Sequence, residues 1–230
     1  MNKWISALLA VGLGLSVATA AYASPKEDAQ ELVDEALYTV KKMSNHERHG
    51  EKVKHYMKDA KAVFVVPELL KGAFLVGGEG GSGVLLARAD NGEWSYPAFF
   101  DMGSGSIGLQ IGAQSSELML IVMTGKGLSA ILNNKVKLGG DISAAVGPVG
   151  EGLEASTTTN LGADVIAYST SKGAFIGASV DGAVIWADHE DNMGYYDNTS
   201  ATPKDIVLNG KYANAHADKL RELLASFPHN

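Results

Sequence analysis

Cysteine is absent from the 230 residues of this chain. Its absence excludes disulfides, thiolate metal sites and a cysteine nucleophile. It also excludes the anchor of a bacterial lipoprotein, which is attached to a cysteine at the mature N-terminus. The chain therefore contains no thiol at any position.

Proline and net positive charge are also scarce. Proline occurs 6 times and glycine 27 times, a balance that indicates tight turns and close backbone packing rather than a disordered linker. Hydrophobic residues make up 46% of the chain, enough for a sizeable core. The formal charge is −7, so bulk electrostatics attract neither nucleic acid nor an anionic membrane. The composition predicts no nucleic-acid partner, and any lipid or phosphate site must be local.

The sequence patterns that usually carry catalysis are missing. No serine stands in a GxSxG elbow, and no nucleophile–base pair can be recognised. Residues 78–83 and 103–108 match GxGxxG, but a dinucleotide site needs a helix after the last glycine, whereas both segments run into predicted strands. Residues 124–127 lack the residue order of a P-loop. We therefore expect β-turns at the glycine motifs, no cofactor and no enzyme activity.

Candidate metal ligands are few. His46 and His49 could share a helical face, but no third ligand follows at short spacing, so solvated histidines are expected. Residues 188–192 are acidic but lack the alternate spacing and the glycine of a calcium loop, which predicts an exposed turn. The sequence predicts no metal site.

A long apolar run occurs at the N-terminus. Lys3 precedes an apolar stretch over residues 4–17, and Ala21-Tyr22-Ala23 fits the small-x-small rule of signal-peptide cleavage. An uncleaved membrane anchor is the alternative, but the Gly- and Ala-rich stretch and the cleavage pattern favour removal, with Ser24 as the first mature residue. Without residues 1–23 the charge would be −8. We expect a signal peptide over residues 1–23, a single domain over 24–230, and a periplasmic or secreted location.

The rest of the chain changes from helical to strand periodicity and back. Apolar spacing predicts helices within residues 25–61, broken near 44–50, and a closing helix over 212–227. The β-branched run at 62–66 predicts a buried strand that Pro67 ends. Further strands are predicted at residues 84–87, 94–100, 107–111, 117–124, 165–168, 174–180 and 183–186, and a short helix at 127–133. The predicted class is α+β, a mostly antiparallel, curved, glycine-rich sheet or partial barrel with flanking N- and C-terminal helices.

Several motifs in order carry a family resemblance. They are AKAVFVVP at 60–67, KGAF at 71–74, GGEGGSGV at 77–84, WSYPAF at 94–99, QIGAQ at 110–114, GPVG at 147–150, YSTSKG at 168–173 and NMGYY at 192–196. In these motifs the chain resembles the SYLF lipid-binding domain family, over roughly residues 30–226. Many separate motifs in the right order are far more specific than one glycine pattern.

The resemblance implies a bacterial secreted member of the family that binds lipid and is not an enzyme. Eukaryotic relatives bind phosphoinositides, and the yeast members also act on actin. Glu151 stands where the family carries a basic residue, and with the acidic charge this argues against phosphoinositide specificity. The implied partner is a phospholipid or membrane surface of the envelope. The alternative is an envelope structural or protein-interaction module, in which Trp94, Phe99, Phe100 and Tyr195 would form a partner patch. For most of these four aromatic residues, however, we expect a place in the core.

Three basic residues beside glycine-rich turns are the candidate lipid-binding residues: Lys71, Arg88 and Lys172. Glycine lets a ligand approach the backbone, where N–H groups and a cation can share one anion. If the three converge on one rim of the sheet, they would hold an anionic headgroup. The alternatives are ordinary surface charge at each position, and a site on the apolar face of residues 29–43.

Overall fold

The structure is a computed structural model, and it describes residues 24–74, 76–107, 112–133, 135–147, 162–170 and 180–229. Two helices come first, α1 (Pro25–Ser44) and α2 (Gly50–Met57), followed by four long strands, β1 (Ala62–Phe74), β2 (Val76–Ala87), β3 (Ala98–Ile107) and β4 (Gly112–Val122). The remaining elements are α3 (Gly125–Asn133), β5 (Val136–Lys137), β6 (Ala144–Val146), β7 (Val165–Ser169), β8 (Val184–Ala187), α6 (His189–Tyr196), α7 (Pro203–Val207), the 3-10 helix η1 (Ala215–Ala217) and α8 (Asp218–Ala225). None of the described helices has both the length and the apolar character that a membrane span requires.

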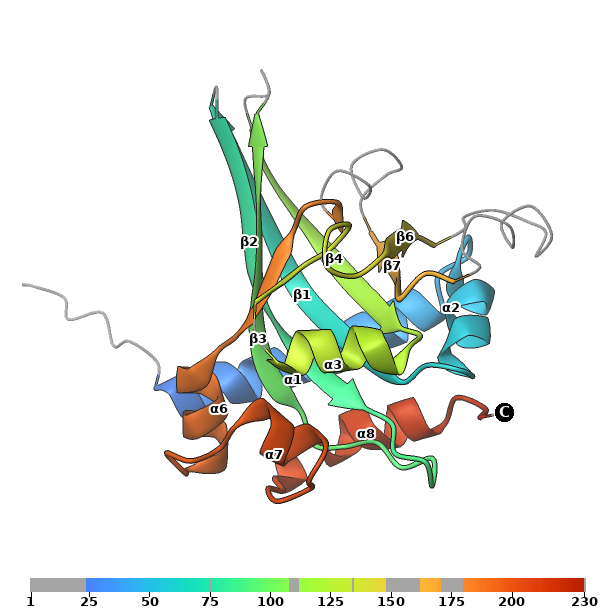
Figure 1. The fold of residues 1–230 in the computed structure, drawn as a ribbon, viewed down its shortest axis with the longest axis vertical. Coiled ribbons are helices and arrows are strands. Elements are labelled where there is room, and N and C mark those ends of the chain that lie inside the picture. Colours follow the sequence, from blue (N-terminus) through green and yellow to red (C-terminus); the bar gives the residue numbers. More distant parts are fainter. Residues whose placement is uncertain are drawn as a thin grey trace, which may run out of the picture.

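The named strands form one sheet in the order β5-β8-β3-β2-β1-β4-β7-β6. Among their pairings only β6–β7 is parallel, and the others are antiparallel. The sheet curls into a half-barrel, and the ribbon of long strands extends past the helices (Figure 1). The predicted α+β class, with a mostly antiparallel curved sheet and helices at both ends of the described chain, is confirmed.

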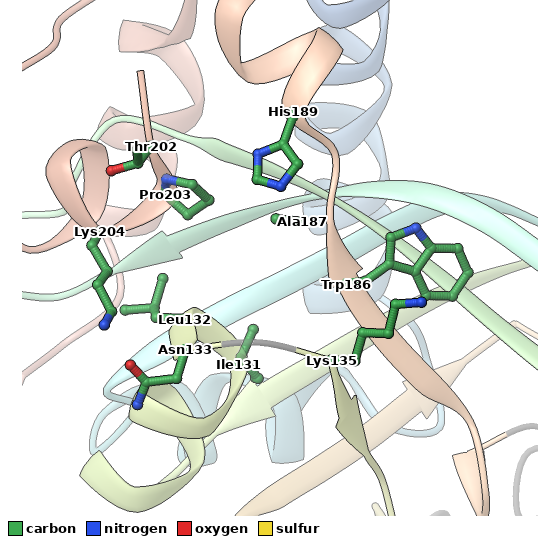
Figure 2. A pocket seen from close by; sticks show the side chains of 10 residues that line it. All are labelled: Ile131, Leu132, Asn133, Lys135, Trp186, Ala187, His189, Thr202, Pro203 and Lys204. Atoms are coloured by element: carbon green, nitrogen blue, oxygen red, sulfur yellow. The ribbon is translucent and has the colours of Figure 1, made fainter. Parts of the chain in front are cut away.

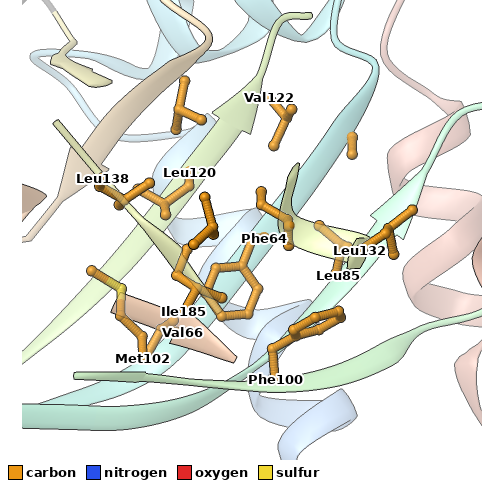
Figure 3. Close-up of a cluster of buried hydrophobic side chains, with 14 of the residues drawn as sticks. Phe64, Val66, Leu85, Phe100, Met102, Leu120, Val122, Leu132, Leu138 and Ile185 are labelled. Atoms are coloured by element: carbon orange, nitrogen blue, oxygen red, sulfur yellow. The ribbon is translucent and has the colours of Figure 1, made fainter. Parts of the chain in front are cut away.

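The central strand β1 shows why the sheet has a core on each face. Successive side chains of a strand point to opposite faces. Phe64 and Val66 pack with Phe100 in the cluster of Figure 3, whereas Val63 and Val65 belong to a second cluster that includes α1 and α8. Burial of both faces explains the continuous apolar run at residues 62–66.

Helix α1 covers the face of the second cluster. It starts with a capping box in which the Ser24 hydroxyl accepts a bond from the Glu27 N–H (3.3 Å) and the Glu27 carboxylate accepts one from the Ser24 N–H (3.0 Å). Its buried residues include Ala29, Val33, Ala36, Val40 and Met43. This stripe packs against β1, β2 and β4 and also against α6 and α8. The two terminal helices therefore lie on the same face of the sheet.

The strands β1 and β2 are longer than predicted. Pro67 does not end β1, because the register shifts between Val66 and Leu69 and this irregularity accommodates a residue without an N–H donor. The glycine motif at 78–83 lies inside β2 rather than in a turn, and residues 103–107 of the second motif lie inside β3. At Gly81 a Cβ would lie 2.2 Å from the Glu68 carbonyl oxygen of the irregular segment. Close approach of two strands, not a turn, requires this glycine.

The segment predicted as a strand at 94–100 also differs. Strand β3 begins only at Ala98, and Trp94 makes an isolated bridge with Arg88. The short helix predicted at 127–133 is confirmed as α3. The closing helix is shorter than predicted, since residues 215–217 form η1 and α8 covers 218–225. Of the strand predicted at 174–180, residues 174–179 lie outside the described residues.

Residues 188–192 are the start of α6, not an exposed turn. The Asp188 side chain caps the helix by accepting a bond from the Asp191 N–H at 3.0 Å. Asn192 is fully buried. Its side-chain oxygen accepts a hydrogen bond from the Phe99 N–H (3.1 Å), and its side-chain nitrogen donates one to the Phe99 carbonyl (2.8 Å). The acidic cluster is thus the capped end of a helix that Asn192 ties to β3.

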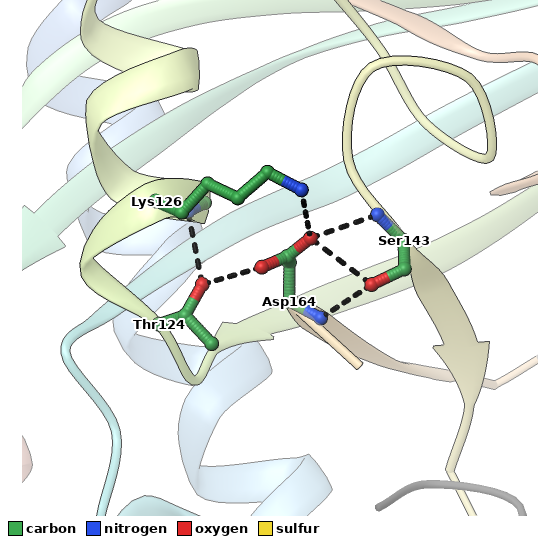
Figure 4. A network of polar contacts seen from close by, with 5 residues as sticks. Thr124, Lys126, Ser143 and Asp164 are labelled. Atoms are coloured by element: carbon green, nitrogen blue, oxygen red, sulfur yellow. Dashed lines mark hydrogen bonds and ion pairs between the residues drawn. The ribbon is translucent and has the colours of Figure 1, made fainter. Parts of the chain in front are cut away.

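A buried carboxylate fixes the start of α3. Asp164, which is 5% exposed, accepts bonds from Thr124 Oγ1 (2.6 Å), Lys126 Nζ (3.2 Å) and both the N–H and Oγ of Ser143 (3.0 Å each), as Figure 4 shows. Burial alone would raise the pKa of Asp164, but these hydrogen bonds outweigh it and lower the pKa to about 2. The network joins the N-terminus of α3 to Ser143 and Asp164, the residues that directly precede the parallel strands β6 and β7.

Candidate functional site

The two predicted site residues that the structure describes, Lys71 and Arg88, do not lie close together. Lys71 lies within β1, opposite Glu79 of β2 and Gln114 of β4. Arg88 follows the other end of β2, nine residues beyond Glu79. At about 3.3 Å per residue the two positions are separated by about 30 Å along the strand. Lys172 lies outside the described residues. The expectation that Lys71 and Arg88 share a rim is therefore wrong, because they occupy opposite ends of one hairpin.

The Arg88 side chain is engaged in a structural role. The residue is 9% exposed, its guanidinium lies 4.6 Å from the centre of the Trp94 ring, and Nη1 donates to the Lys58 carbonyl at 3.0 Å. Burial lowers the pKa of Arg88. This arginine connects the end of α2 to the sheet, and an anion would have to displace packed side chains to reach it.

The four aromatic residues considered for a partner patch are buried. Trp94, Phe99, Phe100 and Tyr195 are at most 2% exposed. Phe99 and Tyr195 contact each other with ring centres 4.9 Å apart. The prediction that most of them fill the core is confirmed, and the patch that would have supported the protein-interaction alternative does not exist.

One of the two paired histidines is not solvated. His49 is buried, stacks on His46 with ring centres 3.9 Å apart and lies 5.5 Å from the Tyr168 ring. Burial, with smaller contributions from His46 and Arg48, lowers the pKa of His49 to about 4. Within the described ranges no three His, Asp or Glu side chains gather closely enough to hold a metal ion.

A pocket of about 490 Å³ opens between the end of α3, strand β8 and the start of α7. We call it the α3–α7 pocket (Figure 2). Its lining residues are Ile131, Leu132, Asn133, Lys135, Trp186, Ala187, His189, Thr202, Pro203 and Lys204. The volume lies in the range of about 300–1,000 Å³ that is common for small-molecule sites.

Local sequence positions these side chains. Ile131 and Leu132 belong to the buried face of α3 and continue the core of Figure 3 into the pocket. The Thr202 hydroxyl caps α7 by accepting a bond from the Asp205 N–H at 3.3 Å, and Pro203 occupies the first turn, where its missing N–H costs nothing. This cap places Lys204 at the pocket.

The lining is basic and apolar. It contains Lys135, His189 and Lys204 but no carboxylate. Three acidic residues are direct sequence neighbours of the lining: Asp205 is held by Lys211 (2.8 Å) and by the Asn209 amide (2.7 Å), Asp188 caps α6, and Glu190 follows His189. An otherwise acidic chain therefore presents an apolar hollow bordered by cations.

A second pocket has the opposite character. It measures about 370 Å³ and is lined by Glu93, Trp94, Tyr96, Asp218, Arg221, Glu222 and Ala225. Its single cation is occupied, because Arg221 lies 4.0 Å from the centre of the Tyr96 ring and donates to the Trp94 carbonyl at 2.9 Å and to Asp218 at 3.3 Å. Of these two pockets, only the α3–α7 pocket is suited to an anion.

Sequence reasoning missed the α3–α7 pocket. Lys135 is visible in the sequence only as one of several scattered cations, and His189 only as part of an acidic segment. The Thr202-Pro203 pair is a helix-start signal, but it carries no sign of a ligand. The pocket joins three segments that are distant in sequence, so no local pattern could have indicated it.

An α+β half-barrel with such a pocket has the features of a binding domain. The family model Ysc84, described as "Las17-binding protein actin regulator", matches residues 103–227. The chain belongs to this family, which is the SYLF family that its motifs resemble.

Several relatives are similar over most of the chain. "SH3 domain-containing YSC84-like protein 1" of Rattus norvegicus is 33% identical over 174 residues, 75% of this chain and 51% of the relative. The Homo sapiens protein of the same name is 32% identical over 174 residues, 75% of this chain and 50% of its own length. "LAS seventeen-binding protein 3" of Saccharomyces cerevisiae (strain ATCC 204508 / S288c) is 35% identical over 159 residues, 67% of this chain and 34% of the relative. The chain thus spans about half the length, or less, of the relatives it matches. No solved structure matches the chain significantly.

Proposed function

We propose that this chain is an exported, non-enzymatic domain that binds an anionic lipid of the cell envelope. The observation that carries the proposal is the α3–α7 pocket, whose lining combines apolar side chains with three basic residues and no carboxylate. Apolar surface favours an acyl chain or the upper part of a lipid, and lysine favours an anionic headgroup. The lipid-binding expectation that comes with the SYLF resemblance supports the same class of ligand, although the description of the matching family model names Las17 binding and actin regulation instead.

The proposed location rests on residues 1–23. Their basic start, apolar stretch and Ala21-Tyr22-Ala23 motif support export and cleavage before Ser24. Export would place the domain beside the phospholipids of the cell envelope. A nucleic-acid partner is not part of this proposal, because the net charge is −7.

Vesicle flotation tests the proposed function. Protein comprising residues 24–230 is mixed with vesicles of phosphatidylglycerol and phosphatidylethanolamine, or with vesicles of phosphatidylcholine alone. We expect flotation with the anionic vesicles and little with the neutral ones, and we expect salt to weaken it, since screening reduces attraction between exposed charges. If the folded protein floats with neither composition, lipid binding is overturned.

The second candidate is a protein-interaction module of the envelope. Its support is the family description, which names Las17 binding and actin regulation for relatives. Exposed apolar side chains such as Tyr38 (70%) and Leu208 (57%) offer contact points for a partner. Native mass spectrometry of the protein isolated from its own envelope separates the two candidates. A lipid adduct supports the first, and a stoichiometric protein partner without lipid supports the second.

A further inference from the structure

We propose that the α3–α7 pocket takes one acyl chain that ends in an anionic head, as in a fatty acid or a single-chain lipid phosphate. This inference rests on the proposed function and specifies its ligand. The shared chemistry is a single unbranched apolar chain joined to a carboxylate or phosphate. Three features of the pocket support this inference: its apolar lining, its two lysines without an ion pair among the described residues, and its volume.

The floor of the pocket is an extension of the hydrophobic core. Ile131 is 1% exposed and Leu132 7% exposed, and both pack in the buried cluster that includes Phe64 and Phe100. Trp186, Ala187 and Pro203 line the same hollow (Figure 2). Water in contact with these side chains makes few hydrogen bonds, so an apolar chain gains free energy by replacing it.

The two lysines of the lining have no ion-pair partner among the residues that the structure describes. Lys42, Lys54, Lys126 and Lys211 each form an ion pair of 3.2 Å or less. By contrast, no ion pair within the described ranges involves Lys135 or Lys204. These two lysines border an apolar hollow in a chain of net charge −7. An anionic head placed between the pocket and solvent would supply the missing counter-charge, and the Asn133 amide and the Thr202 hydroxyl can add hydrogen bonds.

The volume of the pocket favours a ligand with one acyl chain over a phospholipid with two acyl chains. At about 490 Å³ the pocket is in the lower half of the usual range of small-molecule sites. It can hold one extended chain segment with its head at the rim. A two-chain phospholipid would leave a whole acyl chain in water, which is costly because each exposed methylene forfeits about 0.8 kcal/mol of burial.

Trp186 supplies a direct reporter of occupancy. It lines the pocket, and the other tryptophan within residues 24–230 is Trp94, which is buried away from the pocket lining. In the variant Trp94→Phe of the 24–230 protein, all tryptophan emission comes from Trp186. The variant is titrated with dodecanoate, dodecyl phosphate, dodecanol and dodecyltrimethylammonium, all below their micelle concentrations. Calorimetry on the protein that retains Trp94 repeats the ranking independently of that substitution.

We expect a saturable change of Trp186 emission with dodecanoate and dodecyl phosphate at one ligand per protein. Dodecanol should bind about tenfold or more weaker, and the ammonium compound should not saturate. The double variant Lys135→Gln/Lys204→Gln should weaken both anions by about tenfold or more and leave dodecanol unchanged. Lys219→Gln, a change at an exposed lysine of α8 outside the pocket, is the matched control and should behave like the parent protein. The ratio of dodecanoate to dodecyl phosphate affinity tells which head the site prefers.

Three results would overturn the inference. Equal affinity for dodecanol and the two anions would show that the pocket does not recognise an anionic head. Unchanged anion affinity in the double variant would place the site elsewhere. No saturation by any single-chain compound, while anionic vesicles still bind the protein, would show that this pocket is not the lipid site and leave the proposed function standing. If neither the compounds nor the vesicles bind, both proposals fall.

Discussion

Asp164 is the residue on which several segments converge. Its carboxylate accepts bonds from Thr124, Lys126 and Ser143, and its pKa is lowered to about 2. A carboxylate whose pKa is lower in the folded state adds stability above its unfolded pKa of about 3.9, and this stability is lost as the pH falls toward the folded value. The network also holds the start of α3, the helix whose other end lines the pocket.

The first prediction concerns this carboxylate. Asp164→Asn should lower the free energy of unfolding at pH 7 by about 2 kcal/mol, because the amide loses the charge-assisted bonds. The difference from the parent protein should stay constant above about pH 5 and shrink between about pH 4 and pH 2 as Asp164 of the parent is protonated. Urea denaturation at a series of pH values measures this. A difference that does not depend on pH would contradict the lowered pKa.

Glycine has a different purpose at different places in the long strands. At Gly81 a Cβ would lie 2.2 Å from the Glu68 carbonyl oxygen and 2.9 Å from a Val66 methyl. At Gly105 a Cβ would meet nothing within 4 Å. Both residues belong to motifs that look alike in the sequence, so only their neighbours in the sheet separate them.

The second prediction compares these two glycines at the scale of the strand. Gly81→Ala should destabilise the protein by about 2 kcal/mol or more, because the backbone of the irregular segment in β1 must move. Gly105→Ala is the matched control, and it should change stability by about 0.5 kcal/mol or less. Thermal or urea unfolding of both variants decides the matter. Similar losses in the two would mean that strand propensity, not close approach, governs these positions.

Helix α1 carries its own start signal. The capping box satisfies the first N–H groups of the helix without any residue before Ser24. If the signal peptide is removed as proposed, the Ser24 nitrogen becomes an ammonium group that already lies 3.0 Å from the Glu27 carboxylate. Cleavage at this position would thus leave the helix capped.

The third prediction concerns the whole molecule and its processing. Protein recovered from the envelope should begin at Ser24 and be released by osmotic shock without detergent. N-terminal sequencing of the protein in the osmotic-shock fraction tests this. Recovery only in detergent with Met1 intact would contradict cleavage.

Most of the fold could be predicted from the sequence, because its signals are local. Helical spacing in 25–61, the β-branched run at 62–66 and the short helix near 127–133 each follow from neighbouring residues, and the α+β class follows from their order. The errors have local causes too. Pro67 and the glycine motifs weaken a strand in isolation, but β1 and β2 are each paired with a neighbouring strand on both sides, and this pairing keeps these segments extended.

The site depended on what the tertiary structure brings together. By itself the sequence determined the family, through motifs spread along the chain, and the absence of recognisable catalytic patterns. The sequence could not determine which basic side chains lie close together, because their positions in space depend on strand register and strand length. The long antiparallel hairpin carries Lys71 and Arg88 to opposite ends, whereas folding brings Lys135, His189 and Lys204, separated by many residues, around one hollow. Only residues that are close in sequence can be expected to lie close in space without knowledge of the fold. The pocket is lined by three segments that are far apart in sequence.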